Sequence, residues 1–245
     1  MGTTNRTNYH EVVLVTDTGQ AASSFSGLGD GLDGRTQRII ERPFFRPESL
    51  DDLVDTLMSK CGSGSQILYV GVRASATIGL ALAISDFPCI GFVLHEPDLG
   101  PLAAGANRLA MNLLQQVKQG PQSQAALLIL GDRLADHSSK SVTETEFPIN
   151  DTTLLEPRRA MHACAELSII TEFHPAADDL RNIQVPVLLT VGGQSPLARL
   201  GAAQQACEMI QCDGSVIASA TGAPHLQNPK SFAGIIKAFA DQVGL

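Results

Sequence analysis

Short apolar runs alternate with amphipathic segments along most of this chain of 245 residues. The apolar runs are rich in valine, isoleucine and leucine and end at turn-forming residues, which is typical of strands in a sheet. Strands are predicted at residues 11–17, 36–42, 66–72, 89–97, 185–193 and 215–220. The run at 36–42 is the more polar and reads as an edge strand.

Helices are predicted between these strands. Residues 47–64 begin with Pro-Glu-Ser, carry apolar residues at helical spacing and stop at glycine, as an amphipathic helix does. Residues 74–85 are apolar nearly all round, which indicates a buried helix. Residues 196–210 and 231–243 predict two more. Strand and helix in alternation predict an α/β protein with a mainly parallel sheet covered on both faces.

The alternation is interrupted between residues 98 and 178. Helical segments occur there without a convincing strand. The most economical interpretation is an α/β core, residues 1–97 and 179–245, with a helical cap inserted at 98–178. Such a cap is expected to cover a pocket and select its substrate, and its apolar stretches are a candidate surface for a homodimer. The glycine-rich residues 27–34 match no phosphate-binding loop and read as a flexible loop beside the pocket.

Composition narrows the possible partners. The net charge is −8 and the basic residues are scattered, which argues against nucleic acid. No apolar run approaches the roughly 20 residues that a membrane-spanning helix needs, and no signal peptide is visible. The five cysteines lack CxxC spacing, so most are expected to be small buried side chains in a reducing cytoplasm. The histidines show no metal-ligand spacing, so neither a metal nor another cofactor is expected.

Three stretches occur in a telling order. The first is "VVLVTDTGQAASSF", the second is "YVGVRASATIGLALA", and the third runs from "VPVLLTVGGQSP" to "SVIASATGAPHLQNPKSFAGIIKAF". They resemble, respectively, the first core strand with its oxyanion loop, the nucleophile elbow, and the acid and histidine segments of the α/β-hydrolase superfamily. The resemblance covers most of the chain outside the insertion and implies that fold, with the usual N-terminal hairpin absent or reduced.

The resemblance places Arg73 where the family has its nucleophilic serine. Gly71 and Ser75 fill the flanking places that let the elbow turn tightly. A guanidinium stays protonated and is no nucleophile, but it can bind a carboxylate, phosphate or enolate. The alternative is that Arg73 pairs with a nearby acid and plugs a dead pocket. Ser75 is expected to face helix packing rather than act as a replacement nucleophile.

The acid position of the family also differs. Ser195 stands where an aspartate is usual, and Glu96, at the end of another strand, is either a substitute acid or a capping carboxylate. His225 lies on the loop of the family histidine and is a candidate general acid or base with a pKa near the working pH.

The loop after the first strand supplies two further candidates. Asp17 either pairs with Arg73 or acts as the acid or base opposite His225, and the backbone N–H of Thr18 is the candidate oxyanion donor. Thr18 is also a candidate substrate contact. The others are Ser195, Glu96, Val72 and Ala74.

Three functions remain open from the sequence. The first is an enzyme that moves a proton in a small carbonyl compound, as an isomerase, epimerase, cyclase or lyase of specialised metabolism; this rests on analogy with relatives whose triads are degenerate. The second is a non-catalytic protein that binds a ligand or acts as a scaffold. The third is a hydrolase whose catalytic groups have moved. The first two keep a small molecule as the expected partner.

Overall fold

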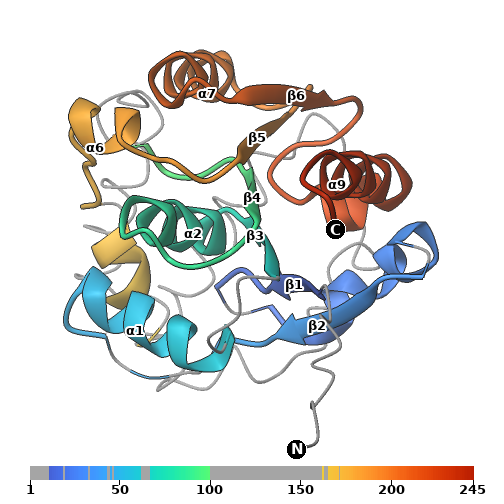
Figure 1. The fold of residues 1–245 in the computed structure, drawn as a ribbon, viewed down its shortest axis with the longest axis horizontal. Helices are drawn as coiled ribbons and strands as arrows, with labels where there is room; N and C mark the ends of the chain where they lie inside the picture. Colours follow the sequence, from blue (N-terminus) through green and yellow to red (C-terminus); the bar gives the residue numbers. More distant parts are fainter. Residues whose placement is uncertain are drawn as a thin grey trace, which may run out of the picture.

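A twisted sheet of six parallel strands forms the centre of the computed structural model (Figure 1). The structure describes residues 11–99 and 162–245, apart from 19, 33, 43, 44, 46, 62–66, 163, 164 and 171. The strand order across the sheet is β2-β1-β3-β4-β5-β6. The strands are β1 (Glu11–Val15), β2 (Thr36–Ile40), β3 (Ile67–Val72), β4 (Gly91–His95), β5 (Val187–Gly192) and β6 (Asp213–Ile217).

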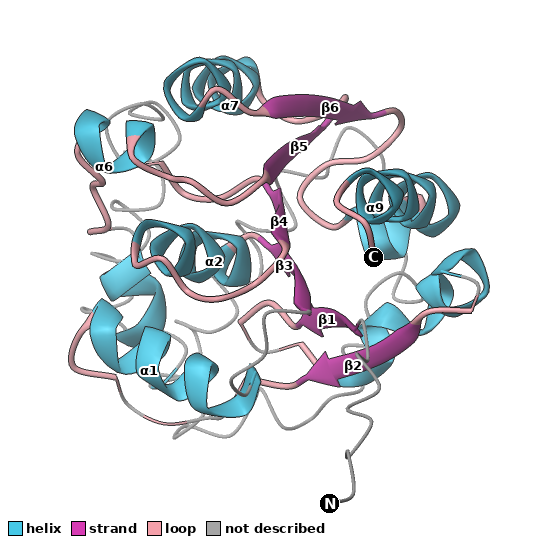
Figure 2. Cartoon of the chain, in the orientation of Figure 1, coloured by secondary structure: helices cyan, strands magenta, loops and turns pink. Residues whose placement is uncertain are grey.

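Helices cover both faces of this sheet (Figure 2). One face carries α1 (Leu50–Cys61), α2 (Ala74–Ile84), α6 (Ala177–Arg181) and α7 (Leu197–Ile210). The other carries the 3₁₀ helix η1 (Ala22–Leu32) and α9 (Pro229–Gln242), with the short α8 (Pro224–Gln227) just before α9. The strands β3 and β4 lie between the two layers and are buried at every residue. Burial on both faces explains why their sequences are continuous apolar runs.

The parallel α/β architecture that the sequence predicts is confirmed, with boundaries that differ by a few residues. The last strand begins and ends earlier than expected, at Asp213–Ile217. The loop before the final helix contains α8. Of the insertion expected at 98–178, residues 100–161 lie outside the described residues, and 165–170 are helical.

The flexible loop expected at residues 27–34 is wrong. Residues 22–32 form η1, in which Phe25, Leu28 and Leu32 are buried against α9. A side chain at Gly31 would overlap Ala233 of α9, so this glycine permits the close approach. Phe25, Leu28 and Leu32 are spaced three and four residues apart, so they lie on one side of η1 and pack against the sheet and α9.

Among the described residues, none of the helices combines the length and the apolar character needed to cross a membrane.

The connection from β3 to α2 is a tight turn. A Cβ on Gly71 would lie 2.7 Å from the carbonyl oxygen of Ser75 and 2.8 Å from the nitrogen of Ala76. The Ser75 hydroxyl accepts a hydrogen bond from the Val72 N–H at 2.8 Å and lies 3.0 Å from the Val15 carbonyl oxygen. The Tyr69 hydroxyl donates to the Ser75 carbonyl at 2.6 Å. Ser75 thus ties the first turn of α2 to two strands.

We expect Gly71→Ala to lower the free energy of unfolding by about 1–3 kcal/mol, because the added methyl group meets backbone atoms that cannot move aside. Urea denaturation measures the change. Gly201→Ala is the matched control, since nothing lies within 4 Å of a Cβ at this exposed site in α7. That substitution is expected to stabilise the protein by about 0.5–1 kcal/mol. Equal stability of the two variants would contradict the crowding argument.

Candidate active site

Arg73 occupies the apex of the turn between β3 and α2. Its backbone has φ 54° and ψ −114°, a conformation that costs a residue other than glycine about 1–3 kcal/mol. Its N–H donates to the His95 carbonyl oxygen at 2.8 Å, and its carbonyl oxygen accepts from the Thr77 N–H at 2.9 Å. These two bonds hold the apex between β4 and the first turn of α2. The strained elbow is therefore retained although its apical residue is an arginine.

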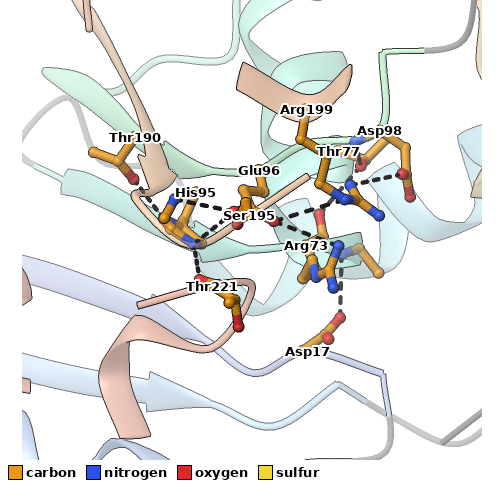
Figure 3. Close-up of polar contacts among 12 residues, drawn as sticks. Asp17, Arg73, Thr77, His95, Glu96, Asp98, Thr190, Ser195, Arg199 and Thr221 are labelled. Carbon is orange, nitrogen blue, oxygen red and sulfur yellow. Dashed lines mark hydrogen bonds and ion pairs between the residues drawn. The ribbon is translucent and has the colours of Figure 1, made fainter. Parts of the chain in front are cut away.

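The guanidinium of Arg73 is buried, with the residue only 6% exposed. Glu96 follows β4, and its Oε2 lies 3.4 Å from the Arg73 Nη1. The carboxylate of Asp17, which follows β1, faces the guanidinium from another direction (Figure 3). A Cβ on Gly222 would overlap the guanidinium, so the missing side chain provides the space in which it lies.

Of the two carboxylates beside Arg73, Glu96 also accepts hydrogen bonds from the residues that follow or end β5. Its Oε1 accepts a hydrogen bond from the Gly192 N–H at 3.0 Å and another from the Ser195 hydroxyl. Burial acts to raise the pKa of the Glu96 carboxyl, but the charge of Arg73, with His95, Arg199 and the Ser195 hydroxyl, outweighs it and lowers the pKa to about 2. Glu96 is therefore an anion at neutral pH. It lies beside Ser195, the expected acid position.

The ion pairs continue along the carboxyl ends of the strands. Arg199 of α7 lies with its Nε 3.8 Å from the Glu96 Oε2 and its Nη1 3.6 Å from the Asp98 Oδ1 (Figure 3). The Asp98 N–H donates to the Thr77 hydroxyl at 2.8 Å. Two arginines thus alternate with three carboxylates, and each guanidinium lies beside carboxylate oxygen.

Asp17 binds two backbone amides through one oxygen. Its Oδ1 accepts from the Thr18 N–H at 2.8 Å and from the Ala74 N–H at 3.1 Å. In enzymes with a serine elbow, the N–H after the apex and an N–H from the loop after an early strand form the oxyanion hole. The Thr18 N–H, the donor expected from the sequence, is therefore present, but it binds the neighbouring carboxylate of the same chain.

The Thr18 hydroxyl takes part in a second charged cluster. It lies 2.6 Å from the Glu166 Oε1 and 2.5 Å from the Arg42 Nη2, and Arg42 and Glu166 pair at 2.5 Å. The Nε of Arg42 donates to the Thr16 carbonyl oxygen at 3.0 Å. This cluster joins the loop after β1 to residue 166, which follows the undescribed segment.

His225 lies in α8, apart from the acid position. Its Nε2 is 3.1 Å from the Oε1 of Gln20, and its ring packs against Phe25 with centroids 4.7 Å apart. An amide oxygen only accepts, so Nε2 carries the proton in this arrangement. The Nδ1 has no hydrogen-bond partner among the described residues. Burial lowers the pKa of His225 to about 3, so the expectation of a pKa near the working pH is wrong.

His95, a residue that the sequence did not single out, is a second buried histidine. Its Nε2 lies 2.8 Å from the Thr221 carbonyl oxygen, and its Nδ1 lies 2.9 Å from the Thr190 hydroxyl. Burial lowers the pKa of His95 to about 4, although the Glu96 carboxylate acts in the opposite direction. His95 is thus neutral at physiological pH and connects the ends of β4 and β5 to the loop before α8.

The structure brings together four of the residues that the sequence proposed: Arg73, Asp17, Glu96 and Ser195. His225 makes its polar contact with Gln20 instead. The side chains of Val72 and Ala74 are buried in the core, which leaves them no direct surface for a substrate. Sequence reasoning missed His95, Arg199, Asp98, Gly222 and Gln20. Among the described residues, no group of three or more His, Cys, Asp or Glu side chains could hold a metal ion.

The two buried histidines predict a pH dependence of stability. Their pKa values of about 4 and about 3 lie below the ordinary 6.5, so between pH 6.5 and 4 the unfolded chain binds more protons than the folded one. Stability therefore falls as the pH is lowered, by about 1.4 kcal/mol per pH unit for each histidine. We expect His225→Gln and His225→Phe each to remove one such increment. Urea denaturation between about pH 7 and 5 measures the slope. An unchanged slope in both variants would contradict the assignment.

We compared the chain with known protein families, curated proteins and solved structures. The family models searched give no match, and neither do the curated proteins. Solved structures do match over nearly the whole chain. MenH from S. aureus has a TM-score of 0.75 at 13% identity, over 98% of this chain and 97% of its own. MGS-M2, an α/β-hydrolase enzyme from a deep-sea metagenome library of the Medee basin, has a TM-score of 0.71 at 15% identity, over 100% and 94%. A lipase-esterase related protein from Clostridium acetobutylicum has 0.70 at 16%, over 94% of each. At identities this low, the structural similarity is evidence about the fold alone. It shows that the chain has the α/β-hydrolase fold.

Proposed function

We propose that this chain is a non-catalytic α/β-hydrolase-fold protein that acts by binding a ligand or partner rather than by hydrolysis. The observation that carries the proposal is the buried Arg73 guanidinium, which lies between Glu96 and Asp17 at the position of a nucleophile. A buried guanidinium with carboxylates on two sides is a stable arrangement of charge, because each partner compensates the loss of water around the other.

Among the described residues, the elbow supplies no nucleophile for a covalent route. The guanidinium of Arg73 stays protonated and has no lone pair to donate. The nearest hydroxyl in sequence, that of Ser75, is fully buried and is bonded to the backbone of Val72 and Val15. A serine in such a setting holds the turn together and has no free base within reach.

The oxyanion donors are also engaged. The Ala74 and Thr18 amides both bind the Asp17 Oδ1, so a tetrahedral intermediate would have to displace a carboxylate that also faces Arg73. Displacement would leave Asp17 and Arg73 buried without their partners, at a cost of about 3–5 kcal/mol for a broken buried pair. The same argument applies to an anionic substrate that competes for the Arg73 guanidinium.

Probing with a fluorophosphonate and a panel of activated esters tests the proposal. We expect no covalent label and no hydrolysis above the buffer rate with the intact chain. A serine esterase treated in parallel controls for the reagents. Stoichiometric labelling that disappears in Ser75→Ala would overturn the proposal in favour of a hydrolase with relocated groups.

Arg73→Met is expected to lower the free energy of unfolding by about 3–5 kcal/mol, because it leaves the carboxylates of Asp17 and Glu96 buried beside an apolar side chain. The combined variant Arg73→Met, Asp17→Asn, Glu96→Gln removes all three charges and is expected to regain most of this loss. Urea denaturation of both proteins at neutral pH measures it. A single variant as stable as the unaltered chain would show that the pairing contributes little.

A second candidate rests on one specific observation. His225 is neutral at physiological pH, and its buried Nδ1 has no hydrogen-bond partner among the described residues, so this nitrogen carries an unused lone pair. This favours a proton-transfer enzyme, an isomerase, epimerase, cyclase or lyase acting on a carbonyl compound. Arg73 would then bind an anionic group of the substrate, and His225 or Asp17 would move the proton.

Deuterium exchange from solvent into a panel of small 2-oxo and 3-oxo acids tests this candidate. Exchange that the intact chain catalyses and His225→Ala abolishes, with the fold retained by circular dichroism, would favour the enzyme. Exchange at the buffer rate with the intact chain is the outcome expected from the non-catalytic proposal. The two candidates therefore give opposite results in one assay.

A further inference from the structure

Two cysteines lie near one another at the C-terminal end of α7, the helix that carries Arg199 near its beginning. The helix ends at Ile210, and Gln211 adopts a left-handed conformation with φ 57° and ψ 44°. The Cys212 N–H then donates back to the Cys207 carbonyl oxygen at 3.1 Å. This six-to-one closure is the Schellman motif, in which the side chains of the two bonded residues commonly contact each other.

The closure makes the two side chains neighbours. Both residues are free thiols that are half-buried, and the Cys207 Sγ lies 3.8 Å from the Asp213 carbonyl oxygen. A Cβ on Gly214 would lie 3.1 Å from the Cys207 sulfur, so the glycine leaves the space in which this sulfur lies. The backbone closure is the observation that brings the two cysteines together, and the effect of each thiol on the pKa of the other agrees with it.

The contact makes the two thiols unequal. The hydrogen bond from Cys212 lowers the pKa of Cys207, although burial and the nearby Asp213 and Glu208 oppose it. The same bond raises the pKa of Cys212. Cys207 is therefore the thiol that ionises first and reacts first, because the thiolate is the nucleophile.

We propose that Cys207 and Cys212 form a reversible oxidation site that closes into an intramolecular disulfide when a peroxide is the oxidant. The Cys207 thiolate attacks one peroxide oxygen, the O–O bond breaks, and hydroxide leaves and takes up a proton to become water. The resulting sulfenic acid is attacked by the Cys212 thiol. The S–S bond forms as the S–O bond breaks, and a second water leaves with the thiol proton. Two thiols thereby lose two electrons and the peroxide gains them.

The other described cysteines lack this chemistry. Burial raises the pKa of Cys61 to about 11 and that of Cys89 to about 12, so both remain protonated at neutral pH. The sequence-based expectation that most cysteines are small buried side chains fits Cys61, whereas Cys89, Cys207 and Cys212 are half-buried. The proximity of Cys207 and Cys212 depends on the left-handed Gln211, which spacing alone does not reveal.

Peptide mapping of the full chain after treatment with hydrogen peroxide tests the proposal. Trypsin leaves both cysteines in one peptide, residues 200–230, because no lysine or arginine lies between Arg199 and Lys230. We expect this peptide to lose both sites of iodoacetamide alkylation together, to become lighter by two hydrogen atoms, and to recover both sites in dithiothreitol. An added oxygen on Met209 is distinguished by its opposite change in mass.

Cys212→Ser is the informative variant. It removes the resolving thiol, so a sulfenic acid is expected to persist on Cys207 and to be trapped by dimedone, whereas the unaltered chain yields the disulfide and little adduct. Cys89→Ser is the matched control and should behave like the unaltered chain. The proposal is overturned if Cys207 in the unaltered chain proceeds to sulfinic acid with Cys212 still alkylated, or if its disulfide joins two chains.

Discussion

A buried positive charge at a forced turn organises the carboxyl ends of the strands. The apical side chain of the elbow between β3 and α2, that of Arg73, is only 7% exposed. A guanidinium at that apex must be compensated by protein groups. Asp17 and Glu96 supply the opposite charge, and Gly222 supplies the room. The neighbouring pairs of Arg199 and Asp98 follow from the same requirement, since Glu96 serves both arginines.

This charge cluster also connects the elements of the sheet. Its members come from the ends of β1, β3 and β4 and from α7, and His95 adds the end of β5 and the loop before α8 through Thr190 and Thr221. In a parallel sheet, these are the ends at which an active site is ordinarily assembled. Here several of the polar groups face one another in ion pairs, while the Glu96 Oε2 and the His225 Nδ1 have no hydrogen-bond partner among the described residues.

The strands and the elbow could be predicted from the sequence because each depends on local order. Continuous apolar runs mark strands buried on both faces, and the small residues around Arg73 mark a tight turn. The pairing of Arg73 with Asp17 was one of the alternatives that the sequence left open. The sequence did not predict that the Thr18 and Ala74 amides bind the Asp17 carboxylate, because this contact depends on how the Asp17 side chain is oriented in the folded loop. Likewise η1 was missed, because its glycines suggested a loop and its partner α9 lies two hundred residues later.

His225 shows the limit of reasoning from position. Its place after the last strand led to the prediction that it corresponds to the family histidine, and the structure places it against Phe25 and Gln20. Burial is the main cause of its lowered pKa, and the Asp17 carboxylate acts in the opposite direction. Position along the chain carries no information about that burial.

The lack of a side chain at Gly222 makes residues 73 and 222, which lie far apart in the sequence, depend on each other. An arginine at residue 73 fits only while residue 222 remains a glycine, and a serine at residue 73 would leave a void against that same glycine. The two codons are therefore expected to change together or not at all during divergence. Joint change of this kind would mark the proteins of this fold that carry an arginine at the elbow.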